Sequence, residues 1–219
     1  VGAVDRPNER KVSKRAAMPL LGGVAVALGC AAGLAAAVVM RDDLAMIGPI
    51  VGFAFGALVL IVVGVYDDRV NVRPVVKLAF QVVAAAIAIE AGFRFDVFTD
   101  PWAQETRVVP IWVMWPLSML WIVGVTNAMN LIDGLDGLSS GIGAIIAGTL
   151  TIICWQAGQW VGVVIGLALF GALIGYLPFN FPPARIFLGD TGSLFIGFGL
   201  ATLALEGYRC LLYTSDAAD

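Results

Sequence analysis

Seven long apolar stretches, separated by short polar segments, account for most of this sequence. They cover residues 16–40, 44–66, 77–93, 108–127, 138–155, 160–177 and 191–206. An apolar run of about 20 residues is long enough to cross the hydrocarbon core of a bilayer as a helix. The pattern therefore predicts an all-α bundle of about seven membrane-spanning helices, of which the third, interrupted by Glu90, is the weakest.

The composition supports a polytopic membrane protein. Hydrophobic residues make up 60% of the chain and charged residues only 13%, and no polar stretch is long enough for a separate soluble domain. The net charge of −3 argues against a nucleic-acid partner, which would require a basic patch. Cys30, Cys154 and Cys210 show no paired ligand spacing, and histidine, the commonest general base and metal ligand, is absent.

The polar segments differ in their basic residues. With residues 1–15 in the cytoplasm, alternation places 67–77, 127–137 and 179–190 on the same side. These four segments hold nine of the 13 Lys and Arg residues, and the segments on the other side hold four. The positive-inside rule favours this orientation. Five tryptophans then fall near the outer interface, as an aromatic belt would: Trp102, Trp112, Trp115, Trp155 and Trp160.

One polar motif lies between two long uncharged runs, Asn127-Ala-Met-Asn-Leu-Ile-Asp-Gly-Leu-Asp-Gly-Leu138. It contains two carboxylates, Asp133 and Asp136, each followed by a glycine that allows a tight turn or a close approach to a ligand. Charge is costly within a membrane-bound chain, so such residues often mark a functional site. The alternative is a solvated turn between two helices.

The predicted topology gathers five carboxylates on the cytoplasmic face: Asp67, Asp68, Asp133, Asp136 and Asp190. Clustered carboxylates repel one another unless a cation lies among them. Mg²⁺ is favoured, with Mn²⁺ as the alternative, because it is bound by one or two carboxylates together with substrate phosphates. Zinc is disfavoured, since paired Cys and His are missing.

Each of these positions also has a simpler interpretation. Asp67 and Asp68 could be solvated at the end of a span, and Lys77 could extend its ammonium group to the interface. Asp190 or Thr191 could cap the helix that begins there. The same helix start, with its glycines and hydroxyl groups, could instead bind a pyrophosphate.

Four segments resemble the polyprenyl-phosphate N-acetylhexosamine-1-phosphate transferases, glycosyltransferase family 4. Gly64-Val-Tyr-Asp-Asp68, with Lys77 and Gln81, is similar to the family's first acidic motif. The motif from Asn127 to Leu138 matches the second almost residue for residue. Asn180-Phe-Pro-Pro-Ala-Arg-Ile-Phe-Leu-Gly-Asp-Thr-Gly-Ser-Leu194 resembles the third. Asp5-Arg-Pro-Asn-Glu-Arg-Lys11, with Pro19 and Gly22-Gly23, is similar to the first cytoplasmic loop.

The resemblance implies an enzyme that moves N-acetylhexosamine 1-phosphate from a UDP-sugar to undecaprenyl phosphate and releases UMP. It implies that Asp67, with Asp68 beside it, acts as base, that Lys77 offsets phosphate charge, and that Asp190 binds the metal. The uridine pocket would comprise Asp133, Gly134, Leu135, Asp136 and Phe187, and substrate would be oriented by Asn127, Asn130 and Asn180. The expected location is the plasma membrane, with the active site facing the cytoplasm, and a homodimer is compatible with the family.

The sequence also departs from the family pattern. Ser13 stands where the family usually has a histidine, and a later histidine-rich cytoplasmic loop is missing. Residues 208–219 do not resemble the family. We therefore expect residues 1–207 to be a transferase domain truncated at both ends, residues 208–219 to be a non-native tail, and the fragment itself to be inactive.

Other functions remain open at this point. A transporter or channel could bind a divalent cation, although transporter sites typically lie near the bilayer midplane. A catalytically inactive scaffold is a further alternative. Within the family, the runner-up is the phospho-N-acetylmuramoyl-pentapeptide transferase branch. The short spacing from Asp68 to Lys77 and the Asp5-Arg-Pro-Asn8 loop resemble the N-acetylglucosamine branch more.

Overall fold

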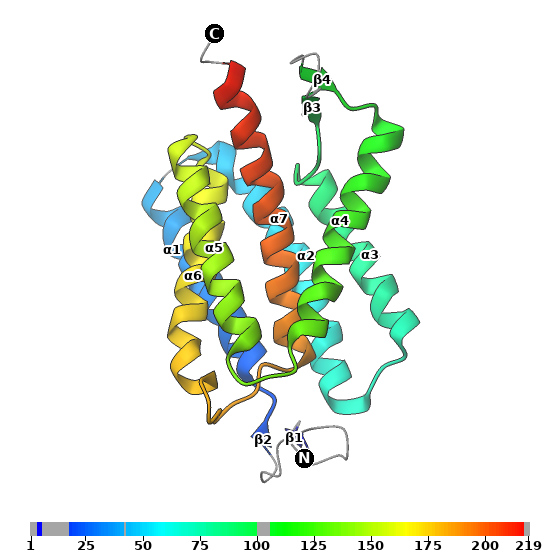
Figure 1. Cartoon of the computed structure of the whole chain (residues 1–219), viewed down its shortest axis with the longest axis vertical. Coiled ribbons are helices and arrows are strands. Elements are labelled where there is room, and N and C mark those ends of the chain that lie inside the picture. Colours follow the sequence, from blue (N-terminus) through cyan, green and yellow to red (C-terminus); the bar gives the residue numbers. More distant parts are fainter. Residues whose placement is uncertain (1–3, 6–17, 42, 100–105, 217–219) are drawn as a thin grey trace.

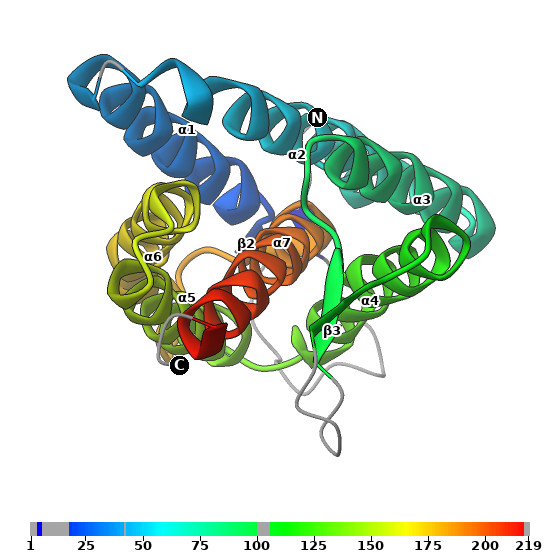
Figure 2. The same ribbon diagram turned by 90° about the horizontal axis from the view of Figure 1, so that it is seen from above.

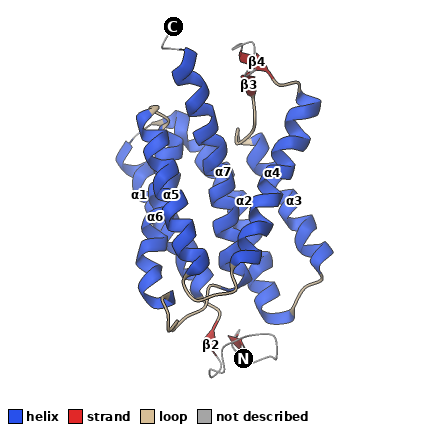
Figure 3. Ribbon diagram, in the orientation of Figure 1, coloured by secondary structure: helices blue, strands red, loops and turns tan. Residues whose placement is uncertain are grey.

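The computed structural model describes residues 4–5, 18–41, 43–99 and 106–216. Seven α-helices form the described part of the chain: α1 (Gly22–Arg41), α2 (Leu44–Val70), α3 (Pro74–Glu90), α4 (Ile111–Ile132), α5 (Leu138–Gln156), α6 (Trp160–Asn180) and α7 (Gly189–Asp216). The described part also contains two short antiparallel strand pairs. The first, β1 (Val4–Asp5) with β2 (Met18–Pro19), precedes α1, and the second, β3 (Val97–Thr99) with β4 (Thr106–Val108), lies between α3 and α4. The predicted all-α bundle is confirmed, with these small pairs as additions (Figure 3).

The helices run alongside one another, and their connections collect at the two ends of the bundle (Figure 1). The α2–α3, α4–α5 and α6–α7 connections lie at one end, which we call the site end. The α1–α2 and α5–α6 connections and the β3–β4 pair lie at the other, the far end. The three predicted acidic motifs therefore meet at the same end of the molecule.

Helix α7 lies at the centre of the bundle, in contact with α1, α2, α4, α5 and α6 (Figure 2). Phe195, Ile196, Phe198 and Leu203 are all buried, on several sides of the helix. A helix that is apolar all round belongs inside a protein, because no face of it can be left to water. The site end of α7 is thus held among its neighbours.

The outer helices show the opposite distribution. Large apolar side chains such as Leu28, Val62, Leu120 and Ile145 are exposed on the outside of the bundle. Five helices (α1, α2, α4, α5 and α6) are long and apolar enough to cross a membrane. Helix α3, with 17 residues, is shorter than those five. A chain that leaves this much apolar surface outward is a multi-pass membrane protein, with lipid covering its outer faces.

Several helices extend beyond the predicted ends. Helix α2 continues past Asp67 and Asp68 and ends at Val70. The next residue, Asn71, adopts a left-handed conformation with φ of 56°. Helix α4 continues through Asn127 and Asn130 to Ile132. A charged or amide side chain does not end a helix, because the backbone hydrogen bonds continue until the main chain turns away. Helix α1 begins later than the predicted residue 16, because Met18–Pro19 forms a strand and the helix starts at Gly22.

Candidate active site

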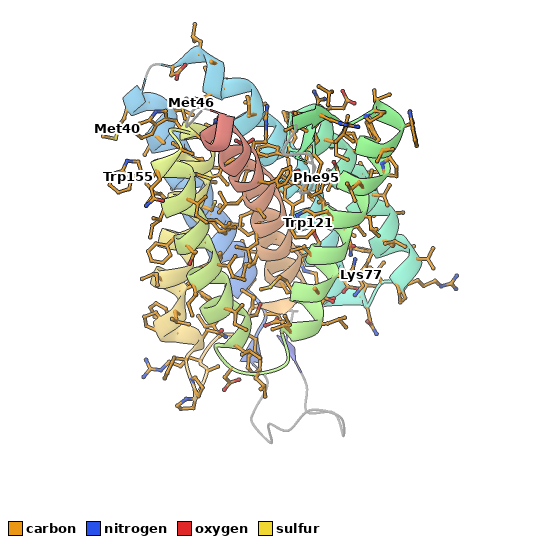
Figure 4. The ribbon with its side chains drawn as sticks, turned by 45° about the horizontal axis from the view of Figure 1, so that its top comes forward. Met40, Met46, Lys77, Phe95, Trp121 and Trp155 are labelled. Carbon is orange, nitrogen blue, oxygen red and sulfur yellow. The ribbon has the colours of Figure 1, made fainter. Side chains whose placement is uncertain are left out.

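Three helix ends come together at the site end: the last turns of α2, the first turn of α3 and the first turn of α7. The α2–α3 connection is tight, and the Val72 N–H donates to Asp67 Oδ1 across it. Pro74 supplies the first residue of α3, a position where its missing N–H costs nothing. Lys77 follows one turn later, on the part of α3 nearest the turn (Figure 4).

The Lys77 ammonium group bridges two carboxylates that are 123 residues apart in the sequence. Its Nζ atom donates to Asp67 Oδ2 at 2.9 Å and to Asp190 Oδ2 at 2.7 Å. The Asp67 side chain is only 5% exposed, whereas that of Asp190 is 35% exposed. Lys77 thus offsets the charge of a buried carboxylate and a second one that remains open to the outside.

Asp68 contacts the start of α7. Its Oδ1 atom accepts from the Asp190 N–H at 2.8 Å. Its Oδ2 atom accepts from the Thr191 N–H at 3.3 Å and from the Thr191 hydroxyl at 2.6 Å. The first amides of α7, which the sequence left open as an anion site, are therefore already occupied by a carboxylate of the protein itself.

Two amide side chains of α4 connect this cluster to its surroundings. Asn127 and Gln81 of α3 form a reciprocal pair of amide hydrogen bonds. Asn130 donates to the Ser193 hydroxyl at 2.8 Å, and Ser193 in turn donates to the Gly189 carbonyl at 3.2 Å. The first turn of α7 is thereby tied to α4 as well as to α2.

The α6–α7 loop, residues 181–188, is held by side chains from both flanking motifs. Asn180 accepts from the Gly137 N–H at 3.1 Å and from Ser140 at 2.7 Å, and donates to the Ile186 carbonyl at 3.1 Å. Tyr176 donates to the same carbonyl at 3.0 Å. Asn180 is therefore buried with protein partners on both ends of its amide group.

Asp136 and the start of α1 hold the remainder of this loop. Asp136 Oδ2 accepts from the Ala184 N–H at 3.0 Å. The N–H groups of Gly22 and Gly23 donate to the carbonyls of Phe187 and Leu188, at 3.1 and 2.9 Å. Gly22 and Gly23 of the predicted first-loop motif are thus in contact with the third motif. Arg6 to Lys11 and Ser13 lie outside the described residues.

The α4–α5 turn is open to the outside. Leu135 is 65% exposed, and Gly134 is exposed beside it. Asp133 and Phe187 are half-buried. The predicted residues therefore form two adjoining groups: a cluster around Lys77, and the pair of loops on either side of Asn180. The structure brings these two groups together through Gly189 and Ser193.

Four participants were not assigned a role from the sequence: Gln81, Ser140, Tyr176 and Ser193. Gln81 lies four residues after Lys77, so both share a face of α3, and this spacing was the available signal. The bonds of the other three reach segments distant in the sequence. They cannot be read from periodicity.

The donor set at this end suits a hard divalent cation. Within the described part of the chain, no three His, Cys, Asp or Glu side chains form a complete metal cage. Asp190, which is partly exposed, offers carboxylate oxygens, and Asp67 lies across Lys77 from it. Mg²⁺ is commonly bound by one or two carboxylates plus substrate phosphates, so these residues fit it.

A separate apolar cavity of about 560 Å³ lies between α1 and α6. Ala25, Gly29, Gly171 and Gly175 line it, with Tyr176 and Ile186 at its border with the α6–α7 loop. Its lining contains no charged side chain, so it is not suited to a nucleotide diphosphate.

Comparison with known proteins gives a consistent result. The model for glycosyl transferase family 4 matches residues 50–208. The chain is 38% identical over 207 residues to a Bacillus subtilis (strain 168) protein named "Probable undecaprenyl-phosphate N-acetylglucosaminyl 1-phosphate transferase", covering 94% of this chain and 56% of that protein. It is 34% identical over 208 residues to a phospho-N-acetylmuramoyl-pentapeptide-transferase of Lactobacillus johnsonii, covering 90% and 64%. The chain spans about three fifths of the length of these relatives.

Proposed function

The chain belongs to glycosyl transferase family 4, and on that premise we propose that it transfers N-acetylglucosamine 1-phosphate from UDP-N-acetylglucosamine to undecaprenyl phosphate. In this reaction an oxygen of the lipid phosphate attacks the β-phosphorus of the UDP-sugar. The bond from that phosphorus to the bridging oxygen breaks, and UMP leaves with the electron pair. The product is a lipid-linked diphosphate sugar, formed at the membrane surface.

One observation carries this proposal: Lys77 joins Asp67 and Asp190 at one end of a membrane-spanning bundle. Two anions that repel each other must react, so catalysis depends mainly on charge neutralisation and alignment. A charged cluster at the ends of apolar helices suits a substrate pair in which one partner is a lipid and the other a soluble nucleotide. A transporter is less well supported, because the carboxylates lie at the helix ends and not near the midplane.

Asp190, with Asp67 nearby, would hold Mg²⁺ or Mn²⁺. When bound, such a cation supplies positive charge to the diphosphate of the donor. Lys77 adds a fixed ammonium group beside it and donates to both carboxylates. Asp67 acts as the base toward the lipid phosphate. A phosphate monoester has a second pKa of about 6, so Asp67 needs to remove at most one proton from the lipid phosphate.

The α4–α5 turn and the α6–α7 loop would bind the uridine. Phe187 stacks on the uracil ring, and the exposed turn beside it is lined by Asp133, Gly134 and Leu135. Asp136 and Asn180 act by holding the loops in place, since each already bonds to main-chain groups there. Asn127 and Asn130 orient the substrate from α4, with Gln81 and Ser193 fixing their amide groups.

The sugar and the location are further parts of the proposal. The B. subtilis relative is named for N-acetylglucosamine, whereas other relatives are named for phospho-N-acetylmuramoyl-pentapeptide. We assign the former because, of these two relatives that each match at least nine tenths of this chain, it is the more identical, 38% against 34%. The plasma membrane is the expected location, with the site end facing the cytoplasm, and a homodimer stays a prediction.

A chimera provides the test of this function. In it, this chain replaces the aligned segment of the B. subtilis relative, and the purified protein receives radiolabelled UDP-N-acetylglucosamine, undecaprenyl phosphate and Mg²⁺. Labelled sugar phosphate should appear in the butanol-extracted lipid in equal amounts with released UMP, and only when the lipid is present.

UDP-N-acetylmuramoyl-pentapeptide serves as the competing donor in the same assay. Product from that donor alone would move the chain to the other branch of the family. No lipid-linked product from either donor, with a chimera that elutes as a single folded species, would refute the transferase assignment.

A further inference from the structure

We propose that Asp68 is a positioning residue: it caps the N-terminus of α7 from the neighbouring helix α2, and so fixes the place of Asp190. The neighbouring carboxylate Asp67 accepts from Lys77, while Asp68 faces the main chain of α7. The part of this proposal that concerns metal binding rests on the proposed function.

Helix α7 has no side chain of its own to cap it. The first four N–H groups of any helix lack partners within the helix. The residue before α7 is Leu188, which offers no acceptor, and the helix begins with Gly189. Asp68 supplies the missing acceptors with both carboxylate oxygens, to the N–H groups of Asp190 and Thr191. A carboxylate at this place is also favoured by the helix dipole.

Close packing makes this contact possible. Gly64 lies one turn before Asp68 on the same face of α2, and a Cβ atom there would lie 2.4 Å from Thr191 Cα. Gly189 has φ of +71°, and a Cβ atom on it would lie 2.7 Å from Asp68 Oδ2. Both glycines therefore leave space that a larger residue would take from the cap. Thr191, which also donates its hydroxyl, is fully buried.

The Asp68 carboxylate is fully engaged by this arrangement. Its two oxygens accept three hydrogen bonds, all from Asp190 and Thr191. Proton transfer through Asp68 would require breaking the cap. Asp190, in contrast, is held at its main chain by Asp68 and at its carboxylate by Lys77. Its position relative to Asp67 is thus set from two sides.

Amide hydrogen exchange of the whole 219-residue chain in nanodiscs tests the cap. The amides of Asp190 and Thr191 should be protected in the wild type, although they lie in the first turn. Asp68→Ala should raise their exchange by about tenfold or more, since it removes hydrogen bonds to a charged group. Asp68→Asn keeps an oxygen acceptor for the Asp190 N–H and should restore most of its protection. Asp43→Asn, at a carboxylate that caps α2 at the far end, is the matched control.

Mn²⁺ binding, followed by its electron paramagnetic resonance signal, tests the positioning role. Asp68→Ala should weaken Mn²⁺ binding about tenfold and Asp68→Asn less, following the order of the exchange rates. Unchanged exchange in Asp68→Ala would overturn the cap. Fast exchange with unchanged Mn²⁺ affinity would overturn the positioning role. If Asp68→Ala fails to fold, Thr191→Val replaces it in the test. This variant removes one donor to Asp68 and should raise amide exchange at residue 191. Unchanged exchange at residue 191 would also overturn the cap.

These results are independent of the transferase assay. Exchange requires no substrate, so a protected first turn that opens in Asp68→Ala would support the cap even if the chimera formed no product. A chimera that forms product while Asp68→Ala leaves exchange unchanged would keep the function and remove the cap.

Discussion

At the residue scale, Lys77 is the group on which the charges of the site depend. It is 20% exposed at its side chain and lies between a buried carboxylate and a partly exposed one. Removing one partner of such a pair destabilises a protein by more than the intact pair stabilises it, because the remaining carboxylate is left buried without a counter-charge. The expected effects of substitution follow from that asymmetry.

Lys77→Met should therefore destabilise the protein more than its packing alone would suggest. We expect a loss of about 3 kcal/mol in the free energy of unfolding, since Asp67 becomes an unpaired buried charge. Asp67→Asn in the same chain should restore part of that loss. Unfolding by SDS from mixed micelles measures all three variants. Strict additivity of the two substitutions would contradict a direct interaction between Lys77 and Asp67.

Asn180 offers a second prediction at this scale. Asn180→Leu is close in volume, but it removes the acceptor of the Gly137 N–H and of the Ser140 hydroxyl, while the Ile186 carbonyl keeps its bond from Tyr176. We expect a loss of about 2 kcal/mol or more, because unsatisfied buried polar groups cost about 1–3 kcal/mol each. Thr149→Val, at an exposed hydroxyl on α5, is the control and should change stability by less than about 0.5 kcal/mol. Equal effects of the two variants would show that Asn180 does not hold the loops together.

The sequence identified the charged residues of the site more fully than their partners. Asp67, Lys77 and Asp190 were all predicted, because acidic and basic residues are rare in such an apolar chain. The polar residues that hold the surrounding groups were not assigned roles, because polar uncharged residues are common in any sequence. Gln81 bonds to Asn127, Ser193 to Asn130 and Tyr176 to the Ile186 carbonyl. The α7 start, for which a pyrophosphate site was one alternative, has its Asp190 and Thr191 amides donating to Asp68. The substrate roles of the predicted residues stay predictions.

At the element scale, the contact between α2 and α7 sets the geometry of the site. Gly64 allows the two helices to approach until Thr191 lies directly against it. Small residues at helix contacts in membranes permit such close approach, which van der Waals packing and hydrogen bonds then stabilise. The Asp68 cap lies one turn further along the same contact.

Gly64→Ala should separate these helices. The new methyl group would lie 2.4 Å from Thr191 Cα, a backbone atom that cannot turn aside. Overpacking of this kind costs about 1–3 kcal/mol, and Mn²⁺ binding should weaken with it. Gly124→Ala on α4 is the matched control: nothing lies within 4 Å of its new methyl group, so it should be neutral or stabilising. Thermal unfolding in detergent compares the two, and a Gly64→Ala protein as stable as Gly124→Ala would contradict the close approach.

The elements themselves could largely be predicted, but their ends could not. Apolar runs indicated all seven helices, and the runs predicted at 138–155 and 160–177 correspond to α5 and α6. The last polar residues of α2 and α4 were placed outside their helices, although Asp67, Asp68 and Asn130 lie within them. The β3–β4 pair was also missed, because three-residue strands leave no periodicity to detect.

At the scale of the whole molecule, the bundle separates two surfaces with different chemistry. The site end carries the acidic motifs and Lys77, whereas Trp112, Trp155 and Trp160 are half-exposed or exposed near the far end. Figure 4 shows Trp155 pointing outward from the bundle. Tryptophan is enriched at membrane interfaces, so this distribution supports a bundle that spans the bilayer from one end to the other.

Thiol labelling tests the orientation of that bundle. In a background without Cys30, Cys154 and Cys210, a cysteine at Val70 or Leu135 should react with impermeant reagents only from the cytoplasmic side. A cysteine at Val108 should react only from outside. All three positions are well exposed, with relative accessibilities of 59%, 65% and 80%. Labelling of Val70 and Val108 from the same side would contradict the topology, and reversed labelling would contradict the orientation.

The central claim is that one divalent cation, held by Asp190, engages the diphosphate of a UDP-sugar at the site end. Electron–nuclear double resonance on the Mn²⁺-loaded chain with UDP-N-acetylglucosamine measures this directly. The account predicts one bound Mn²⁺ per chain, coupled to ³¹P of the donor. Asp190→Asn should abolish the signal while the protein stays folded, since the main-chain bond to Asp68 is kept. Asp43→Asn, a capping carboxylate at the far end, should leave the signal unchanged. A coupled Mn²⁺ signal of equal intensity in Asp190→Asn would contradict the account.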